Sequence, residues 1–241
     1  MPARDWYRPG MRLLLINPNS TQEMTATIAG QASAIAGVDT EIRAVNPVDT
    51  PPAIQGVEDG EAALPGLFAL FDREVASWNP SAVVIACFDD TGLIELKIGS
   101  DIPVIGIGEA AFHAAMLLGG NFSVVTTLAV SVPVITKNID FYGISARCAG
   151  VRASGVPVLD LENSRVDAFN IIADEIERSL LHDKPDSIVL GCAGMAGLAG
   201  EMSERFGMPV VDGVTAATVL AEAIINLQRP ENGVIEKKVK S

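Results

Sequence analysis

Apolar and polar residues follow one another along the chain in blocks of two lengths. Short apolar runs rich in Val and Ile alternate with longer stretches that have the 3.6-residue period of amphipathic helices. The apolar runs that we interpret as buried strands cover 13–16, 82–86, 104–107, 123–125, 187–190 and 209–211. The helical patterns cover 21–36, 58–77, 109–118, 130–142, 165–181 and 214–227. This alternation predicts an α/β fold built from βαβ units, with mostly parallel sheets flanked by helices.

Several residues mark expected helix ends. Ser20 is the expected N-cap of the first helix. Gly37, Gly119 and Gly143 follow predicted helices at positions where a left-handed glycine would end them. Pro65 lies inside the second pattern, so we expect that helix to be kinked there or to start there.

The most informative pattern is an internal repeat. SAVVIACFDDTGL at 81–93 aligns with DSIVLGCAGMAGL at 186–198, and DIPVIGIGEAA at 101–111 aligns with GMPVVDGVTAA at 207–217. MRLLLINPNS, which begins at Met11, aligns more loosely with NFSVVTTLAV, which begins at Asn121. The separations agree, at 192 − 87 = 105 for two cysteines and 209 − 103 = 106 for two prolines. The chain is therefore predicted to contain two similar halves.

The repeat predicts two α/β subdomains related by a pseudo-twofold axis. The first covers 11–110 and is completed by a C-terminal helix at 213–228, and the second covers 111–212. The segments 1–10 and 229–241 are expected to be flexible ends. Because no Pro/Gly-rich linker separates the halves, we expect them to pack tightly around a cleft that holds the active site.

Composition and charge exclude several classes of protein. The 241 residues carry a formal charge of −13, which argues against a nucleic-acid binder with a basic stripe. Two histidines, His113 and His182, are too few for a metal centre built on several histidines. Three cysteines without C-x-x-C spacing suit neither a zinc ribbon nor a disulfide framework. Since the sequence shows no signal peptide and no 18-residue apolar run, we expect a soluble, cytoplasmic protein without membrane or metal partners.

Two of the three cysteines occupy equivalent places in the repeat. Cys87 and Cys192 follow the ends of predicted strands, where parallel α/β sheets bind ligands. Two thiols that approach one cleft from opposite sides suit the inversion of a carbon stereocentre, because one thiolate removes a proton while one thiol returns it from the other face. A helix N-terminus near each cysteine is expected to favour the thiolate, whereas Asp89 and Asp90 oppose this unless they are turned away or act as N-caps. Cys148 has no repeat mate and is expected to pack as a small apolar residue.

Six motifs in order resemble the hydantoin racemase family, which includes allantoin racemases, within the aspartate/glutamate racemase superfamily. They are INPNST (16–21), ACFDDTGL (86–93), GIGEAA (106–111), FSVVTTL (122–128), LGCAGMAGL (190–198) and PVVDGV (209–214). The resemblance implies two pseudo-symmetric subdomains, chemistry without a cofactor, a small-molecule substrate and a homo-oligomer. It places the catalytic pair on Cys87 and Cys192. It also implies substrate contacts from Asn17, Phe88, Thr126, Thr127, Ala193 and Gly194, with backbone N–H groups after each cysteine as oxyanion donors.

The residues after the cysteines help to choose a substrate. Phe88, Ala193 and Gly194 favour a neutral, flat ring over an amino acid held by its charged groups. We therefore predict an isomerase that racemises 5-substituted hydantoins, with allantoin as one candidate, through an enolate-like intermediate at C5. An aspartate/glutamate-type racemase and a maleate isomerase are the alternative enzymes, and a two-lobed binding protein without turnover is the alternative outside enzymes. An arylmalonate decarboxylase would need only the second cysteine.

Two further features imitate the motifs of different enzyme classes. Gly106 and Gly108 match part of a dinucleotide-binding fingerprint, but the equivalent segment of the second half lacks the glycine pair. His113 could pair with a thiolate, as in a Cys-His hydrolase, although a packed or capped histidine is the expected role.

Overall fold

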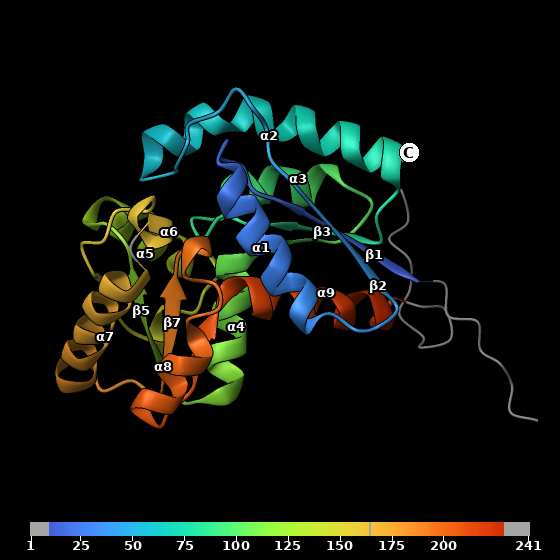
Figure 1. Ribbon diagram of the computed structural model, residues 1–241. Helices are drawn as coiled ribbons and strands as arrows, with labels where there is room; N and C mark the ends of the chain where they lie inside the picture. The colour runs from blue at the N-terminus through green and yellow to red at the C-terminus, as the bar shows by residue number, and fades with distance from the viewer. Residues whose placement is uncertain (1–9, 164, 229–241) are drawn as a thin grey trace, which may run out of the picture.

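The fold consists of two parallel four-stranded sheets, one in each half of the chain. The structure, a computed structural model, describes residues 10–163 and 165–228 (Figure 1), so the predicted flexible ends fall outside the described residues except for Gly10. The first sheet has the order β2-β1-β3-β4 and the second β6-β5-β7-β8. The strands are β1 (Met11–Ile16), β2 (Thr40–Val45), β3 (Ala82–Ile85), β4 (Val104–Gly106), β5 (Phe122–Thr126), β6 (Cys148–Ala153), β7 (Ser187–Gly191) and β8 (Val210–Asp212). Because equivalent strands occupy equivalent places, the predicted α/β class and the repeat are confirmed.

Helices lie between the strands along the chain. They are α1 (Gln22–Ile35), α2 (Val57–Trp78), α3 (Leu93–Gly99), α4 (Ile107–Leu118), α5 (Val132–Phe141), α6 (Asp160–Asn163), α7 (Arg165–His182), α8 (Ala199–Phe206) and α9 (Gly213–Leu227). The six predicted helical patterns correspond to α1, α2, α4, α5, α7 and α9, whereas the short helices α3, α6 and α8 had no predicted range. Short 3-10 turns cover Ala129–Ser131, Ser145–Arg147 and Ala193–Met195. No helix in the described part of the chain is long and apolar enough to cross a membrane.

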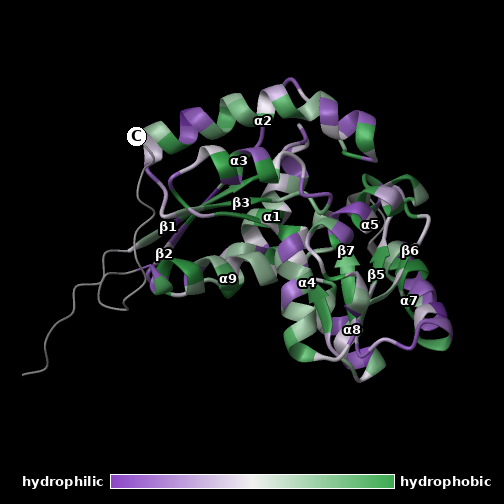
Figure 2. Cartoon of the chain, turned by 180° about the vertical axis from the view of Figure 1, so that it is seen from behind, coloured by the Kyte–Doolittle hydropathy of each residue, from purple (hydrophilic) through white to green (hydrophobic). Residues whose placement is uncertain are grey.

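Each sheet is covered on both faces, so its strands bury alternate side chains in different layers. In β1, Leu14 and Ile16 pack with α2 and α3, while Leu13 and Leu15 pack with α1 and with the core between the halves. The second sheet repeats this pattern, with its outer face against α7 and α8. Its strands β5 and β7 are green, hence hydrophobic, in Figure 2. Burial on both faces explains why these strands are continuous apolar runs.

Two helices connect the halves, because each packs on the half of the chain to which its preceding strand does not belong. Helix α9 follows β8 of the second sheet but packs on α1 and the first sheet (Figure 1). The side chain of Gln31 on α1 donates a 2.8 Å hydrogen bond to the hydroxyl of Thr215 on α9. Just after α1, the backbone N–H of Gly37 donates a 2.9 Å hydrogen bond to the carboxylate of Glu222, which is also on α9. Helix α4 follows β4 and in turn packs on β7, β8 and α9. The predicted boundary between 110 and 111 falls inside α4.

Some local predictions differ from the structure. The N-cap of α1 is Thr21 rather than Ser20. Helix α2 begins at Val57 and continues through Pro65, so a start at the proline is wrong. Gly143 has the expected positive φ of 72°, whereas Gly119 is extended and α1 ends at Ala36 without a left-handed glycine. The pattern also missed β2 and β6, because these edge strands are only half-buried and carry charged residues.

The glycines after the two cysteines show the repeat at backbone level. Gly92 and Gly197, which occupy equivalent positions, have φ of 69° and 83°. A positive φ strains any residue with a Cβ atom, so glycine is the favoured residue at both turns. The turns after the two cysteines therefore share this glycine and lead towards α3 in one half and α8 in the other, although Asp90 in the first turn also has a positive φ of 50° and its counterpart Met195 lies in a 3-10 turn.

Candidate active site

The ends of β1, β3, β5 and β7 converge on one cavity between the halves. Its lining consists of Asn19, Met24, Ile54, Ala86, Cys87, Phe88, Asp89, Thr127, Ser131, Val158, Gly191, Cys192 and Ala193. Both cysteines of the repeat line it, from opposite halves of the chain. The cavity volume is about 30 Å³, which is room for very few water molecules. A ring-shaped ligand therefore fits only if the walls move apart.

Cys87 lies two residues beyond β3 and is held as a neutral thiol. The hydroxyl of Thr91 lies 3.5 Å from its Sγ atom, and the backbone N–H of Asp89 donates to the same sulfur. Burial raises the pKa of the Cys87 thiol well above its usual range, and the carboxylate of Asp89 raises it further. The two hydrogen bonds oppose this increase without reversing it, and the charge of Cys192 adds a smaller rise. The expectation that a helix N-terminus favours the thiolate is wrong for Cys87, because α3 begins only at Leu93.

Asp90 is turned away from Cys87 and caps a helix. Its carboxylate accepts hydrogen bonds from the backbone N–H groups of Gly108, at 3.0 Å, and Glu109, at 2.8 Å, at the start of α4. The hydroxyl of Tyr142 donates a third, at 2.7 Å. Burial raises the pKa of Asp90 to about 7 although these hydrogen bonds lower it. Asp90 is thus turned away, as one of the two alternatives predicted, and it fixes the turn after Cys87 to α4, although the N-cap residue of α4 itself is Gly106.

Asp89 differs from Asp90 in its surroundings. It lines the cavity of the two cysteines, and its Oδ2 atom is buried without a hydrogen-bond partner among the described residues. Burial alone raises the pKa of Asp89 to about 7. Its backbone is fixed independently of the carboxylate, because the side chain of Asn138 donates a 2.8 Å hydrogen bond to its carbonyl oxygen.

The glycine pair Gly106 and Gly108 is explained by packing around this cap. A Cβ atom at Gly108 would lie 2.5 Å from the carbonyl oxygen of Phe88 and 2.8 Å from Oδ2 of Asp90. A Cβ atom at Gly106 would overlap the Asp90 carboxylate. The pair lets α4 approach the turn after Cys87, so its resemblance to a dinucleotide-binding loop has a structural cause. His113 is exposed on α4, with its Nδ1 atom 2.8 Å from the carbonyl oxygen of Glu109.

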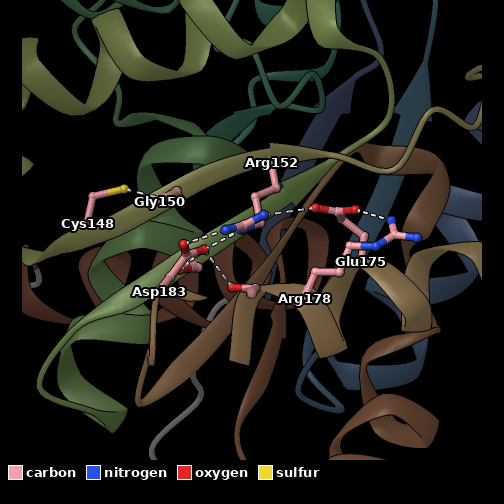
Figure 3. A network of polar contacts seen from close by, with 8 residues as sticks. Cys148, Gly150, Arg152, Glu175, Arg178 and Asp183 are labelled. Atoms are coloured by element: carbon pink, nitrogen blue, oxygen red, sulfur yellow. Dashed lines mark hydrogen bonds and ion pairs between the residues drawn. The ribbon is translucent and has the colours of Figure 1, made fainter. Parts of the chain in front are cut away.

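The other two cysteines lie in different surroundings. Cys192 directly follows β7 and precedes the 3-10 turn Ala193–Met195, whose last residue donates its N–H to the Cys192 carbonyl at 3.1 Å. Cys148 opens β6, packs against the core and is not among the residues that line the cavity. Its Sγ atom lies 3.6 Å from the carbonyl oxygen of Gly150, beside an ion-pair network (Figure 3). Burial raises the pKa of the Cys148 thiol.

The network in Figure 3 is a structural feature of the second half. The guanidinium of Arg152 on β6 donates to Asp183 at 2.5 and 2.7 Å and to Glu175 of α7 at 3.3 Å. Arg178 reaches the other oxygen of Glu175 at 2.6 Å. The pKa of Asp183 is lowered chiefly by its hydrogen bonds with Arg152. These pairs connect the half-buried edge strand β6 to α7 and the segment after it.

The structure brings together only part of the predicted binding set. Phe88, Thr127 and Ala193 line the cavity, whereas Asn17, Thr126 and Gly194 do not. The predicted contacts outside the lining have structural partners. Asn17 donates to Asn19 at 2.9 Å and to Thr25 at 3.0 Å, and the hydroxyl of Thr126 donates to the Gly191 carbonyl at 2.8 Å. Asn17 therefore positions the loop after β1, and Thr126 joins β5 to β7.

Eight residues of the lining are not among the predicted site residues, although Asn19 stands beside Asn17 in a motif that was considered for ligand contact. They are Asn19, Met24, Ile54, Ala86, Asp89, Ser131, Val158 and Gly191. The repeat contained a signal for two of them, because Ile54 and Val158 are separated by 158 − 54 = 104 residues and follow the equivalent strands β2 and β6. The sequence places Asp89 two residues after Cys87, but it does not show whether Asp89 lines the cavity.

The fold, the paired cysteines and the motifs together define a racemase family. The Asp/Glu/Hydantoin racemase family matches residues 13–221, and the chain belongs to it. The chain is 43% identical over 215 residues to a hydantoin racemase of Rhizobium meliloti, which covers 89% of each protein. It also resembles the crystal structure of allantoin racemase from Pseudomonas fluorescens, with 40% identity, a TM-score of 0.86 and 95% of each chain covered. Allantoin racemase from Klebsiella pneumoniae gives 35% identity and a TM-score of 0.87, with 95% of this chain and 91% of that chain covered. The predicted family and the predicted enzyme class, an isomerase, are confirmed.

Proposed function

We propose that this protein racemises 5-substituted hydantoins at C5 without a cofactor, with Cys87 and Cys192 as the acid and base. The observation that carries the proposal is the convergence of these two thiols, from equivalent positions of the repeat, on one cavity. The names of the similar proteins, hydantoin racemase and allantoin racemase, support the substrate class.

The proposed reaction is a pair of proton transfers on opposite faces of C5. The thiolate of Cys192 removes the C5 proton, and the electron pair moves onto a ring carbonyl oxygen to give an enolate. Cys87, which burial and Asp89 keep protonated, donates its proton to the other face of C5. The product is the opposite enantiomer, Cys192 is left as the thiol and Cys87 as the thiolate, so the second enantiomer reacts with the roles exchanged. Backbone N–H groups after the cysteines stabilise the enolate oxygen in this proposal.

The lining of the cavity favours a hydantoin over the acidic substrates of the alternative enzymes. Most of it is apolar, including Met24, Ile54, Phe88 and Val158, and none of the described residues that line it is Lys or Arg. Aspartate, glutamate and maleate carry carboxylates that need positively charged or several polar partners when they are buried. Asp89 would repel them. A neutral ring avoids both problems.

The test follows one enantiomer of a 5-substituted hydantoin in heavy water. We expect its optical rotation to decay to zero much faster than in buffer, with deuterium at C5 of both enantiomers. The matched control is the double variant Cys87→Ser/Cys192→Ser, which should be inactive. Racemisation no faster than in buffer, or unchanged in the double variant, would overturn the proposal. Parallel incubations with aspartate, glutamate and maleate test the other enzymes.

A binding protein without turnover makes a different prediction. It would be stabilised against heat by the ligand, whether or not the two thiols are present, and would not exchange the C5 proton. A panel of alkyl, aryl and ureido hydantoins, the last represented by allantoin, then identifies the preferred C5 substituent.

A further inference from the structure

Asp89 has a buried carboxyl oxygen that no contact in the described part of the protein satisfies. Its Oδ2 atom has no hydrogen-bond partner among the described residues, although Asp89 lines the cavity that holds Cys87 and Cys192. The neighbouring Asp90, by contrast, accepts three hydrogen bonds. Buried acceptors in proteins are normally paired, so an unpaired one at a ligand cavity calls for a donor, and a ligand can supply it.

The chemistry of the cavity restricts that donor. No Lys or Arg lines the cavity among the described residues, and the role of Asp89 in positioning Cys87 uses its backbone N–H rather than its carboxylate. A hydantoin ring carries N–H groups next to its carbonyl groups, and these donors lose their water when the ring is buried. We propose that the free oxygen of Asp89 accepts a hydrogen bond from a ring N–H of the substrate and so determines specificity for rings that are not alkylated at that nitrogen. This inference rests on the proposed racemase function.

The internal repeat shows that the carboxyl group is not needed to build the turn. In the second half, Gly194 takes the place of Asp89, and a turn still follows the cysteine and ends at a glycine with positive φ, Gly197. The backbone at Asp89 is held by Asn138, a contact that a side-chain substitution leaves in place. Substitution of the carboxyl group is therefore expected to preserve the fold, and removal of an unpaired buried acceptor can even stabilise it.

The experiment combines protein variants with methylated substrates. Wild type, Asp89→Asn and Asp89→Leu are each assayed with one 5-substituted hydantoin, with its N1-methyl derivative and with its N3-methyl derivative. Asp89→Leu removes both oxygens, whereas Asp89→Asn keeps one oxygen that can accept the N–H. The matched control is Glu95→Gln, which removes a carboxylate from a surface groove of about 540 Å³ that Asp89 also lines.

We expect Asp89→Leu to lower kcat/KM for the unmethylated ring by roughly 10- to 100-fold, mainly through KM, and Asp89→Asn to have a smaller effect. Methylation of the contacted nitrogen should lower kcat/KM of the wild type by a similar factor but have little effect in Asp89→Leu, because the interaction is already lost. Glu95→Gln should behave as wild type with all three substrates.

Equal losses for methylated and unmethylated rings in Asp89→Leu, or a loss confined to kcat, would overturn the inference. A wild type that racemises none of the three hydantoins would instead overturn the proposed function. If Asp89→Leu does not fold, the same comparison of KM between Asp89→Asn and wild type decides the question, since loss of the charge alone weakens a hydrogen bond to a ring N–H.

Discussion

The turn after Cys87 and the turn after Cys192 end at equivalent glycines but differ in electrostatics. Each follows the third strand of its half in chain order, and the glycines with positive φ, Gly92 and Gly197, are equivalent. The first turn carries Phe88, Asp89 and Asp90, whereas the second carries Ala193, Gly194 and Met195. The charge of Asp89 acts on Cys87, and nothing in the second turn replaces it.

In the proposed mechanism, this difference makes the two thiols of a pseudo-symmetric scaffold chemically unequal. A two-thiol racemase needs one protonated and one deprotonated sulfur at the start of each turnover. If both turns were alike, neither cysteine would be favoured as the acid. Burial and Asp89 raise the pKa of Cys87, so the first half supplies the proton donor of the free enzyme in the proposed mechanism. Four predictions test how far the two turns differ.

The largest expected effect comes from removal of either thiol. Cys87→Ser and Cys192→Ser should each lower racemisation roughly 10²- to 10⁴-fold, because a hydroxyl is a poor acid and a poor base near neutral pH. Kinetics with both enantiomers of one hydantoin measure this loss. Cys148→Ser is the matched control and should stay within about twofold of wild type, since Cys148 packs outside the cavity. A single variant with full activity would show that its thiol does not transfer a proton.

The residues before the cysteines are also unequal. A Cβ atom at Gly191 would lie 2.8 Å from Cβ of Thr126 and 3.0 Å from a methyl group of Val124, whereas the equivalent Ala86 carries a methyl group without difficulty. Gly191→Ala should lower the free energy of unfolding by about 1–3 kcal/mol through overpacking. Ala86→Gly should lower it by about 0.5–1 kcal/mol. Urea denaturation measures both, and equal effects would show that the two sheets tolerate the same packing.

Asp89 should make stability depend on pH. Its pKa is about 7 in the folded protein and about 4 when unfolded, so the folded state holds the proton more tightly. The stabilisation is complete below about pH 4 and is lost as the pH rises through about 7. In Asp89→Asn the fall in unfolding free energy between pH 4 and pH 8 should be smaller by about 1–3 kcal/mol, with Asp90 accounting for part of what remains. Urea denaturation at several pH values measures this, and parallel curves for the two proteins would contradict it.

The smallest expected effect is on thiol reactivity. Asp89 raises the pKa of Cys87, so Asp89→Asn should lower that pKa and increase alkylation of Cys87 by iodoacetamide at pH 8, by up to about tenfold. Cys192, whose turn carries Gly194 in the equivalent position, serves as the internal control and should change less than about twofold. Peptide mass spectrometry reports both rates at once. An equal increase at both cysteines would mean that the variant opens the cavity rather than changing a charge.

Much of the fold could be predicted because both sheets are covered on two faces. Strands such as β3 and β7 are continuous apolar runs, and the repeat aligned their ends with the cysteines. The edge strands β2 and β6 could not be recognised in this way, because a half-exposed strand tolerates polar residues such as Glu41 and Arg152. The long-range packing of α4 and α9 also had no complete local signal, since it depends on surfaces that meet only in the folded protein.

The candidate site, like the fold, could be predicted only in part. Its two sulfur atoms followed from the repeat, whereas Asn17 and Thr126, although correctly placed at strand ends, have side chains occupied by Thr25 and Gly191. Side-chain direction at a strand end is decided by neighbours from other segments, and a motif does not contain them. For this reason Asn19 and Thr127 line the cavity, while the side chains of Asn17 and Thr126 make hydrogen bonds to other segments.

The sequence by itself was sufficient to predict the two-sheet fold and the equivalence of Cys87 and Cys192, because periodicity and repetition can be recognised along the chain, and its six motifs carried the resemblance to the family. The tertiary structure alone decided that Asp90 turns to α4 while Asp89 stays in the cavity. It also decided that Cys87 is more difficult to ionise than an exposed thiol, because its burial depends on segments that are distant in sequence. Proton affinity is set by surroundings in space, and the chain acquires these only when it folds.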